Sequence, residues 1–196
     1  VELMIVIAIL AILAAVVIFA LNPAELFRRA RDSQRMSDLR VLSSALSYYL
    51  ADVTTPVLDG SGNTLCSNGS GTDTIFATSA NTTLPTGWGA WVASTNRTVA
   101  GAGWLKVNFT TGGAGTSPIG QLPIDPSNSG ITATPSTMYT FGCHTSLAFE
   151  LDANMESTNY KSLESADGGD LAEVYEMGTQ IIGLLPATTT NFYTNH

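Results

Sequence analysis

The pattern of apolar and polar positions divides the chain into an unbroken apolar start, an amphipathic middle and a long polar remainder. From Leu3 to Leu21 no side chain is charged or polar, and neither Gly nor Pro occurs. As a helix, this run spans about 28 Å, close to the hydrocarbon thickness of a bilayer. Glu2 is the only ionisable side chain beside it. The pattern predicts a hydrophobic transmembrane helix over residues 1–22.

A second helical pattern follows directly over residues 23–52. Its apolar residues recur at the spacing of one helix face: Leu39, Leu42, Ala45, Leu46, Tyr49 and Leu50. Pro23 removes a backbone donor, so we expect a kink or break near it. We otherwise expect one long helix, apolar in its first half and amphipathic in its second. Four arginines lie near the start of this second half: Arg28, Arg29, Arg31 and Arg35. They predict a solvated basic face or contact with lipid phosphates.

Residues 53–196 carry the patterns of short strands. Residues 53–87 are rich in Gly, Ser, Thr and Asn, which predicts a loop-rich insertion with at most short strand or helix pieces. Beyond it we expect five strands, the third and fourth forming a hairpin: 88–94, 104–109, 139–143, 147–151 and 171–178. The region 151–164 favours neither helix nor strand. We therefore expect an α+β fold, in which the long N-terminal helix packs on a C-terminal antiparallel sheet.

Length and charge narrow the class of protein. Beyond the two helical segments roughly 145 residues remain, enough for one globular domain with its own core. Residues 1–51 carry five arginines and four carboxylates, whereas residues 52–196 carry three cations and twelve carboxylates. Such an acidic, neutral-polar exterior argues against general nucleic-acid binding and fits an exposed extracellular surface. In an exported domain we expect Cys66 and Cys143 to form a disulfide, with two buried free thiols as the alternative.

The first ten residues, Val-Glu-Leu-Met-Ile-Val-Ile-Ala-Ile-Leu, resemble the mature N-terminus of bacterial type IV pilins and the related pseudopilins. In that family three residues, typically Phe-Thr-Leu, precede the Val-Glu pair, so we expect the chain to lack its first few mature residues. The residues of the second helical half and the segment from Leu122 to Pro126 are similar to the family's pattern as well. A plain single-span anchor is the main alternative. A secretory signal peptide fits poorly, because no basic region precedes the apolar run.

The resemblance implies a structural subunit, a major pilin, which polymerises into an extracellular helical filament with uses in adhesion, motility or DNA uptake. The implied partners are further copies of the chain, the inner membrane before assembly, a prepilin peptidase and the pilus assembly machinery, with a methylated N-terminus. Two residues carry implied assembly roles. Glu2 meets the amine of an adjacent subunit, and Pro23 ends a stretch, Val16–Asn22, that melts in the filament. A type II secretion pseudopilin and a membrane-anchored adhesion domain that never polymerises are the alternatives.

No arrangement of residues in the sequence predicts an enzyme. His144 and His196 have no neighbouring residues that indicate a nucleophile or a base, and no zinc spacing or phosphate loop occurs.

A cation site is the one chemical candidate. Asp167 and Asp170 flank two glycines, and further oxygen donors for calcium are Glu164, Glu173 and Asp125. Several pseudopilins bind calcium in a late loop, which supports this hypothesis, and a solvated acidic turn is the alternative. Glycans on Ser and Thr are also expected candidates, as are glycans at four Asn positions: Asn68, Asn81, Asn96 and Asn108.

Overall fold

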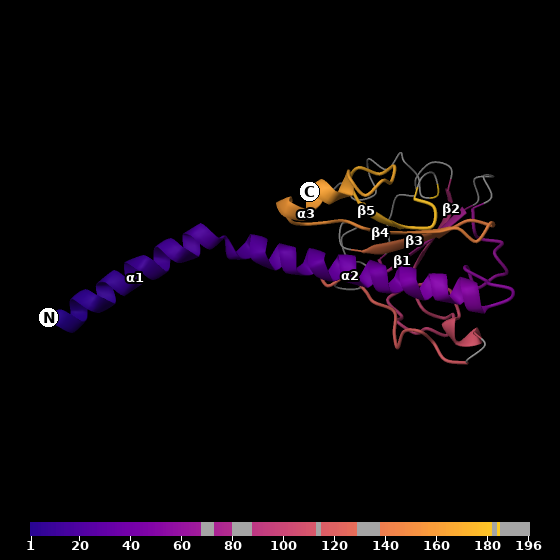
Figure 1. Cartoon of the computed structure of the whole chain (residues 1–196), viewed down its shortest axis with the longest axis horizontal. Helices are drawn as coiled ribbons and strands as arrows, with labels where there is room; N and C mark the ends of the chain where they lie inside the picture. The colour runs from indigo at the N-terminus through magenta and orange to yellow at the C-terminus, as the bar shows by residue number, and fades with distance from the viewer. Residues whose placement is uncertain (68–72, 80–87, 113–114, 129–137, 182–183, 185–196) are drawn as a thin grey trace.

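The computed structural model describes residues 1–67, 73–79, 88–112, 115–128, 138–181 and 184 of the chain. Two helices form its N-terminal part, α1 (Glu2–Leu21) and α2 (Pro23–Asp52). α1 projects away from the remainder, whereas α2 runs along it (Figure 1). We call the folded part that follows residue 52 the head. The predicted α+β architecture is confirmed.

The two helices meet at Asn22, whose backbone is left-handed, with φ 41° and ψ 76°. Asn adopts this conformation more readily than most residues. Pro23 then occupies the first position of α2, where a helix needs no backbone N–H. The helix axes bend by 45° at this break. The predicted kink near Pro23 is therefore confirmed, and the expected long helix is two helices.

Five strands form one sheet in the order β2-β1-β3-β4-β5, with β1 and β2 parallel and the other pairs antiparallel. The predicted hairpin is confirmed as β3 and β4, and the predicted first and last strands as β2 and β5. The strand bounds are β1 Asp73–Ala77, β2 Trp88–Ala93, β3 Tyr139–Cys143, β4 Phe149–Ala153 and β5 Tyr175–Gly178. In the ambiguous region, Thr158–Glu164 is a short helix, α3.

The predicted strand at residues 104–109 is wrong, although its alternation correctly predicts burial. Leu105, Val107 and Phe109 are buried in the core against α2. The backbone bonds to neighbouring loops, with the Phe109 N–H donating to the Val99 carbonyl oxygen at 2.9 Å, and a 3-10 turn (Phe109–Thr111) follows. Because the segment packs beside the helix, its backbone groups find partners in these loops and need no sheet.

The core lies between α2 and the sheet. α2 contributes the face predicted from its spacing, with Leu39, Leu42 and Leu46 fully buried, and the sheet contributes Phe141 and Phe149. Each such apolar side chain stabilises the fold by roughly 1.5–3 kcal/mol relative to an exposed position. This packing fixes α2 to the head along its C-terminal half.

The predicted disulfide between Cys66 and Cys143 is present, with a Cα–Cα distance of 4.8 Å. It ties the loop after α2 to the end of β3, where the Ser67 N–H also donates to the Cys143 carbonyl oxygen at 2.7 Å. The bond therefore reinforces a contact that the backbone already makes.

We expect the double change Cys66→Ser and Cys143→Ser to lower the free energy of unfolding by about 4 kcal/mol, because the bond closes a long loop in the unfolded chain. Denaturant unfolding of the full chain in detergent, followed by near-ultraviolet circular dichroism, measures the loss. Two free thiols in the native protein by non-reducing mass spectrometry would contradict the assignment.

Candidate functional site

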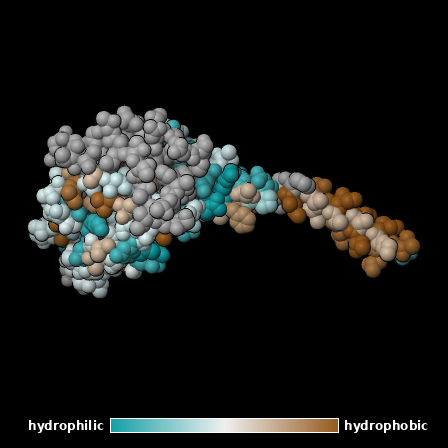
Figure 2. Space-filling view, turned by 180° about the vertical axis from the view of Figure 1, so that it is seen from behind, coloured by the Kyte–Doolittle hydropathy of each residue, from teal (hydrophilic) through white to brown (hydrophobic). Residues whose placement is uncertain are grey.

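The surface of α1 is apolar and uncovered along its length. Every residue from Val1 to Ile18 is exposed, and its large apolar side chains are between 52% and 97% exposed. Figure 2 shows this apolar helix in brown, beside a head whose coloured residues are mostly teal or near-white. Soluble monomers rarely expose apolar patches above a few hundred Å². The surface of α1 therefore requires cover from lipid or from another protein surface.

The length and hydropathy of the two N-terminal helices agree in part with the predicted membrane helix. In the described part of the chain, no single helix is both long and apolar enough to cross a membrane, but α1 and α2 together pass as a bent pair.

Glu2 lies in the first turn of α1, where its negative charge interacts favourably with the helix dipole. It makes no ion pair within the described residues. An unpaired carboxylate costs several kcal/mol when it is taken out of water. Any surface that covers the tip of α1 must therefore offer Glu2 a polar partner or water.

The second implied assembly residue, Pro23, forms the junction with Asn22. The Asn22 carbonyl oxygen accepts from the N–H groups of Glu25 at 3.0 Å and Leu26 at 3.4 Å, which starts α2 directly after the break. α1 is helical through Leu21. Melting of residues 16–22 was predicted for a filament, so it stays a prediction that the single chain does not test.

Arg35 does not lie on the solvated or lipid-facing surface that was predicted for it and three other arginines of α2. It is fully buried, and its Nε and Nη2 donate to the two carboxylate oxygens of Asp125 at 2.6 and 3.0 Å. Its Nη1 donates to Asp32 at 2.7 Å and lies 3.2 Å from Glu156. Asp125 is therefore an ion-pair partner of α2, and the prediction that it helps to hold calcium is wrong. Arg28 and Arg29 match the predicted exposed face.

Asp32 extends this cluster to the segment before α3. Its carboxylate accepts from the backbone N–H groups of Glu156 at 2.9 Å and Ser157 at 2.8 Å. Burial lowers the pKa of Arg35, but the hydrogen bonds and charge of Asp125 outweigh it, so that the pKa is raised above its ordinary value. The guanidinium therefore keeps its charge and joins three segments of the chain.

On the sheet face opposite α2, the structure brings together a set of carboxylates. This set differs from the predicted calcium ligands. Glu150, Asp170 and Glu176 each present an oxygen within 4.8 Å of the others. Asp167 has another role, since its two oxygens accept from the N–H groups of Gly169 at 3.0 Å and Glu176 at 2.7 Å. It shapes the loop, and Asp170 is the predicted ligand that joins the cluster.

Glu150 and Glu176 of this acidic cluster are buried together with the neighbouring Asp152, whereas Asp170 is not buried. Within the described residues, one oxygen each of Asp152 and Glu176 has no hydrogen-bond partner. Burial raises the pKa of Glu176 to about 7, with smaller contributions from Asp167 and Asp170. Burial and then the charge of Glu176 raise the pKa of Asp152. Bound protons or a hard cation such as calcium would relieve this repulsion, so the donor set fits calcium, which stays a prediction.

The remaining sequence candidates make local contacts. The amide oxygens of Asn96 and Asn108 accept from the backbone N–H groups of Thr98 and Thr110. Asn68 and Asn81 lie outside the described residues, and glycosylation stays a prediction. His144 Nδ1 accepts from the Ser146 N–H at 3.0 Å in an exposed turn, and no carboxylate within the described residues bonds to it. This arrangement caps a turn.

We compared the chain with protein-family models, with curated proteins and with solved structures, and none of them matches it.

We expect Arg35→Met to lower the free energy of unfolding by about 3–5 kcal/mol, because it leaves the carboxylates of Asp32 and Asp125 buried without their cation. Denaturant unfolding of the full chain in detergent measures the change. The matched control is Arg28→Met on the exposed face of the same helix, which should leave the unfolding midpoint unchanged. Equal midpoints for the two variants would contradict the structural role of Arg35.

We expect the stability of the head to fall as the pH rises from about 4.5 through 7. Burial raises the pKa of Glu176 to about 7 from an ordinary value of 4.5, so the folded state holds a proton that the unfolded state releases. Melting temperatures in a chelating buffer measure the slope, and Glu176→Gln should flatten it.

Calcium added at pH 8 should raise the melting temperature of the unsubstituted chain but not that of the Glu176→Gln variant. An unchanged melting temperature of the unsubstituted chain would contradict the calcium prediction.

Proposed function

We propose that the chain is a structural subunit of an extracellular type IV pilus-like filament, with the role of a major pilin. The observation that carries this proposal is α1, an apolar helix left uncovered by its own head and tipped by a single carboxylate. The resemblance of its first ten residues to type IV pilins points the same way. α1 holds the subunit in the inner membrane before assembly and lies among other copies of α1 afterwards.

Apolar burial and helix packing supply the driving force for assembly. Side chains that contact lipid in the membrane contact neighbouring helices in the filament, and small residues such as Ala8, Ala11 and Ala15 allow these helices to approach closely. Because the chain bends at Asn22, α1 and the head lie along different axes. The heads therefore lie outside the bundle of apolar helices. The disulfide fits an extracytoplasmic location for the head.

A type II secretion pseudopilin is the second candidate, favoured by the acidic cluster of Glu150, Asp170 and Glu176 as a place for calcium. The segment from Leu122 to Pro126 gives it less support than its sequence implies. In this chain that segment has a structural task, because its Asp125 binds Arg35 of α2. A membrane-anchored adhesion domain would leave α1 in lipid permanently and form no filament.

We expect Glu2→Ala to leave the subunit folded and membrane-inserted while surface filaments become rare or absent. Pairing of Glu2 offsets its desolvation only when an incoming subunit sits at the right height, so the charge sets the register. Electron microscopy of the cells counts the filaments, and membrane fractionation measures insertion. Glu173→Ala, which removes an exposed carboxylate of the head, is the control. Normal numbers of filaments from Glu2→Ala cells, with unchanged helical order, would contradict the register role of Glu2.

A further inference from the structure

A pocket of about 380 Å³ lies beside β5, the last strand of the sheet, where residues of α2 and α3 complete its walls. Most of the lining is apolar or aromatic: Met36, Leu163, Ala166, Tyr175, Met177 and Ile181. Small-molecule sites in proteins commonly have volumes of about 300–1,000 Å³. The side chains of the two methionines are unbranched and adapt readily to the shape of a bound molecule. The pocket is therefore suited to a small molecule with an apolar body.

A buried carboxylate, that of Glu176, also lines this pocket. Glu176 is only 2% exposed, and its Oε2 accepts from the Leu171 N–H at 2.9 Å. Its Oε1 has no hydrogen-bond partner within the described residues, and no cation among them forms an ion pair with Glu176. A buried acceptor without a donor is destabilising, and more so when it carries charge. A ligand that donates a hydrogen bond to Oε1 would remove this penalty.

The geometry of the carboxylate selects the kind of donor. A guanidinium binds best to two carboxylate oxygens at once, but Oε2 of Glu176 is already engaged. A quaternary ammonium has no N–H to donate. Calcium takes about six to eight oxygen ligands, which the apolar walls of the pocket do not supply. A primary ammonium donates a single strong bond to Oε1, and the charge of Asp167 in the same lining adds to its attraction.

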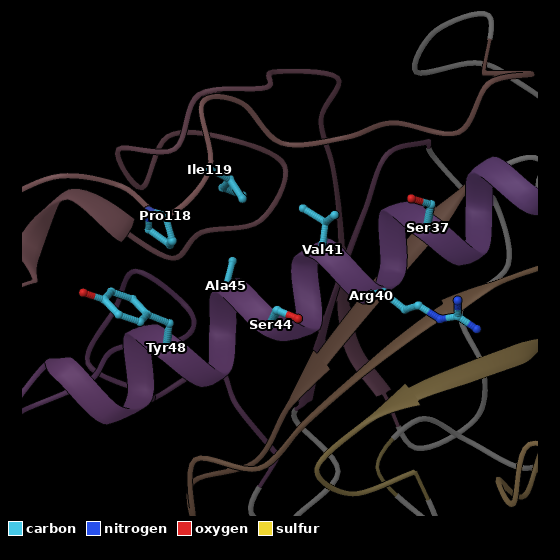
Figure 3. A pocket seen from close by; sticks show the side chains of 8 residues that line it. All are labelled: Ser37, Arg40, Val41, Ser44, Ala45, Tyr48, Pro118 and Ile119. Atoms are coloured by element: carbon cyan, nitrogen blue, oxygen red, sulfur yellow. The ribbon is translucent and has the colours of Figure 1, made fainter.

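Another pocket of similar size shows that this preference is specific to the site at β5. It has a volume of about 390 Å³ and lies between the outward face of α2 and a loop that contains Pro118 and Ile119 (Figure 3). The only charged residue in its lining is Arg40, at one end (Figure 3). That pocket therefore repels an organic cation, whereas the pocket at β5 attracts one.

We propose that the pocket at β5 binds a small free amine, a primary ammonium on a short alkyl chain. The ammonium donates to Glu176 Oε1, and the alkyl chain packs against Met36 and Met177. Because the volume admits a whole small molecule, the ligand is a free amine rather than the lysine side chain of a partner protein. This site goes beyond the proposed filament function and does not depend on it.

Nuclear magnetic resonance of the full chain in detergent, with ¹³C-labelled methionine methyl groups and a chelator present, tests the site. Titration with n-butylammonium chloride should shift the methyl signals of Met36 and Met177 until they saturate. Met4, on the exposed surface of α1, should not shift and reports any uptake of the amine by the detergent. n-Butanol has the same alkyl chain without the charge, and it should need at least a tenfold higher concentration for the same shift.

Three variants separate the pocket from the rest of the head. Glu176→Gln should weaken the binding of n-butylammonium at least tenfold, because it removes the negative charge. Its matched control is Glu173→Gln, an exposed carboxylate of the same segment outside the pocket lining, which should bind as the unsubstituted chain does. Ala166→Phe fills the pocket from an exposed position and should abolish the shifts, so it tests the site even where Glu176→Gln does not fold. Circular dichroism verifies the fold of each variant.

Several outcomes would overturn the site. Equal responses to n-butanol and n-butylammonium would show a pocket without a preference for a cation. Shifts that never saturate and that Met4 follows would show uptake by the detergent alone. Unchanged binding by a folded Glu176→Gln or Ala166→Phe variant would place the amine elsewhere. Tighter binding of a short lysine-containing peptide than of n-butylammonium would overturn the assignment of a free ligand. None of these measurements depends on whether the chain forms filaments.

Discussion

The buried guanidinium of Arg35 fixes how the head is joined to its helix. It binds Asp125 from the loop before the hairpin and Asp32 from its own helix, and it lies beside Glu156 from the segment before α3. A buried charge is tolerated only when every partner is in place, so this cluster favours one position of α2 on the head over all others. Apolar packing holds the second half of α2, and the Arg35 cluster holds the first.

This attachment leaves α1 entirely outside the head. The break at Asn22 lies just ahead of the residues that the head holds, so residues 1–18 stay exposed and no described part of the head covers them. The molecule therefore combines a folded, acidic head, stable through its own core and disulfide, with an apolar helix that needs partners from elsewhere. α2 continues from this junction along the head, at an angle of 45° to the exposed apolar helix.

Sequence periodicity predicted the local elements well, because the hairpin of β3 and β4 and the buried face of α2 follow from spacing alone. The disulfide followed from the presence of two cysteines in an exported domain. Periodicity could not reveal what covers the other face of an element. Glu150 alternates with Phe149 and Leu151 along β4, yet it is as fully buried as they are, beside Asp170 and Glu176 from later in the chain. The partner of Arg35 is 90 residues away, beyond any local signal.

The disulfide also determines how the molecule responds to mechanical tension. Because Cys66 and Cys143 are 77 residues apart, the segment between them cannot lengthen the chain when its ends are pulled. Full extension of such a segment would add about 270 Å of contour. β1, β2 and nearly all of β3 lie inside this closed loop, so tension that unravels the outer part of the head passes through the sulfur bridge. Reduction of the bridge would turn a short, stiff tether into a long, compliant one.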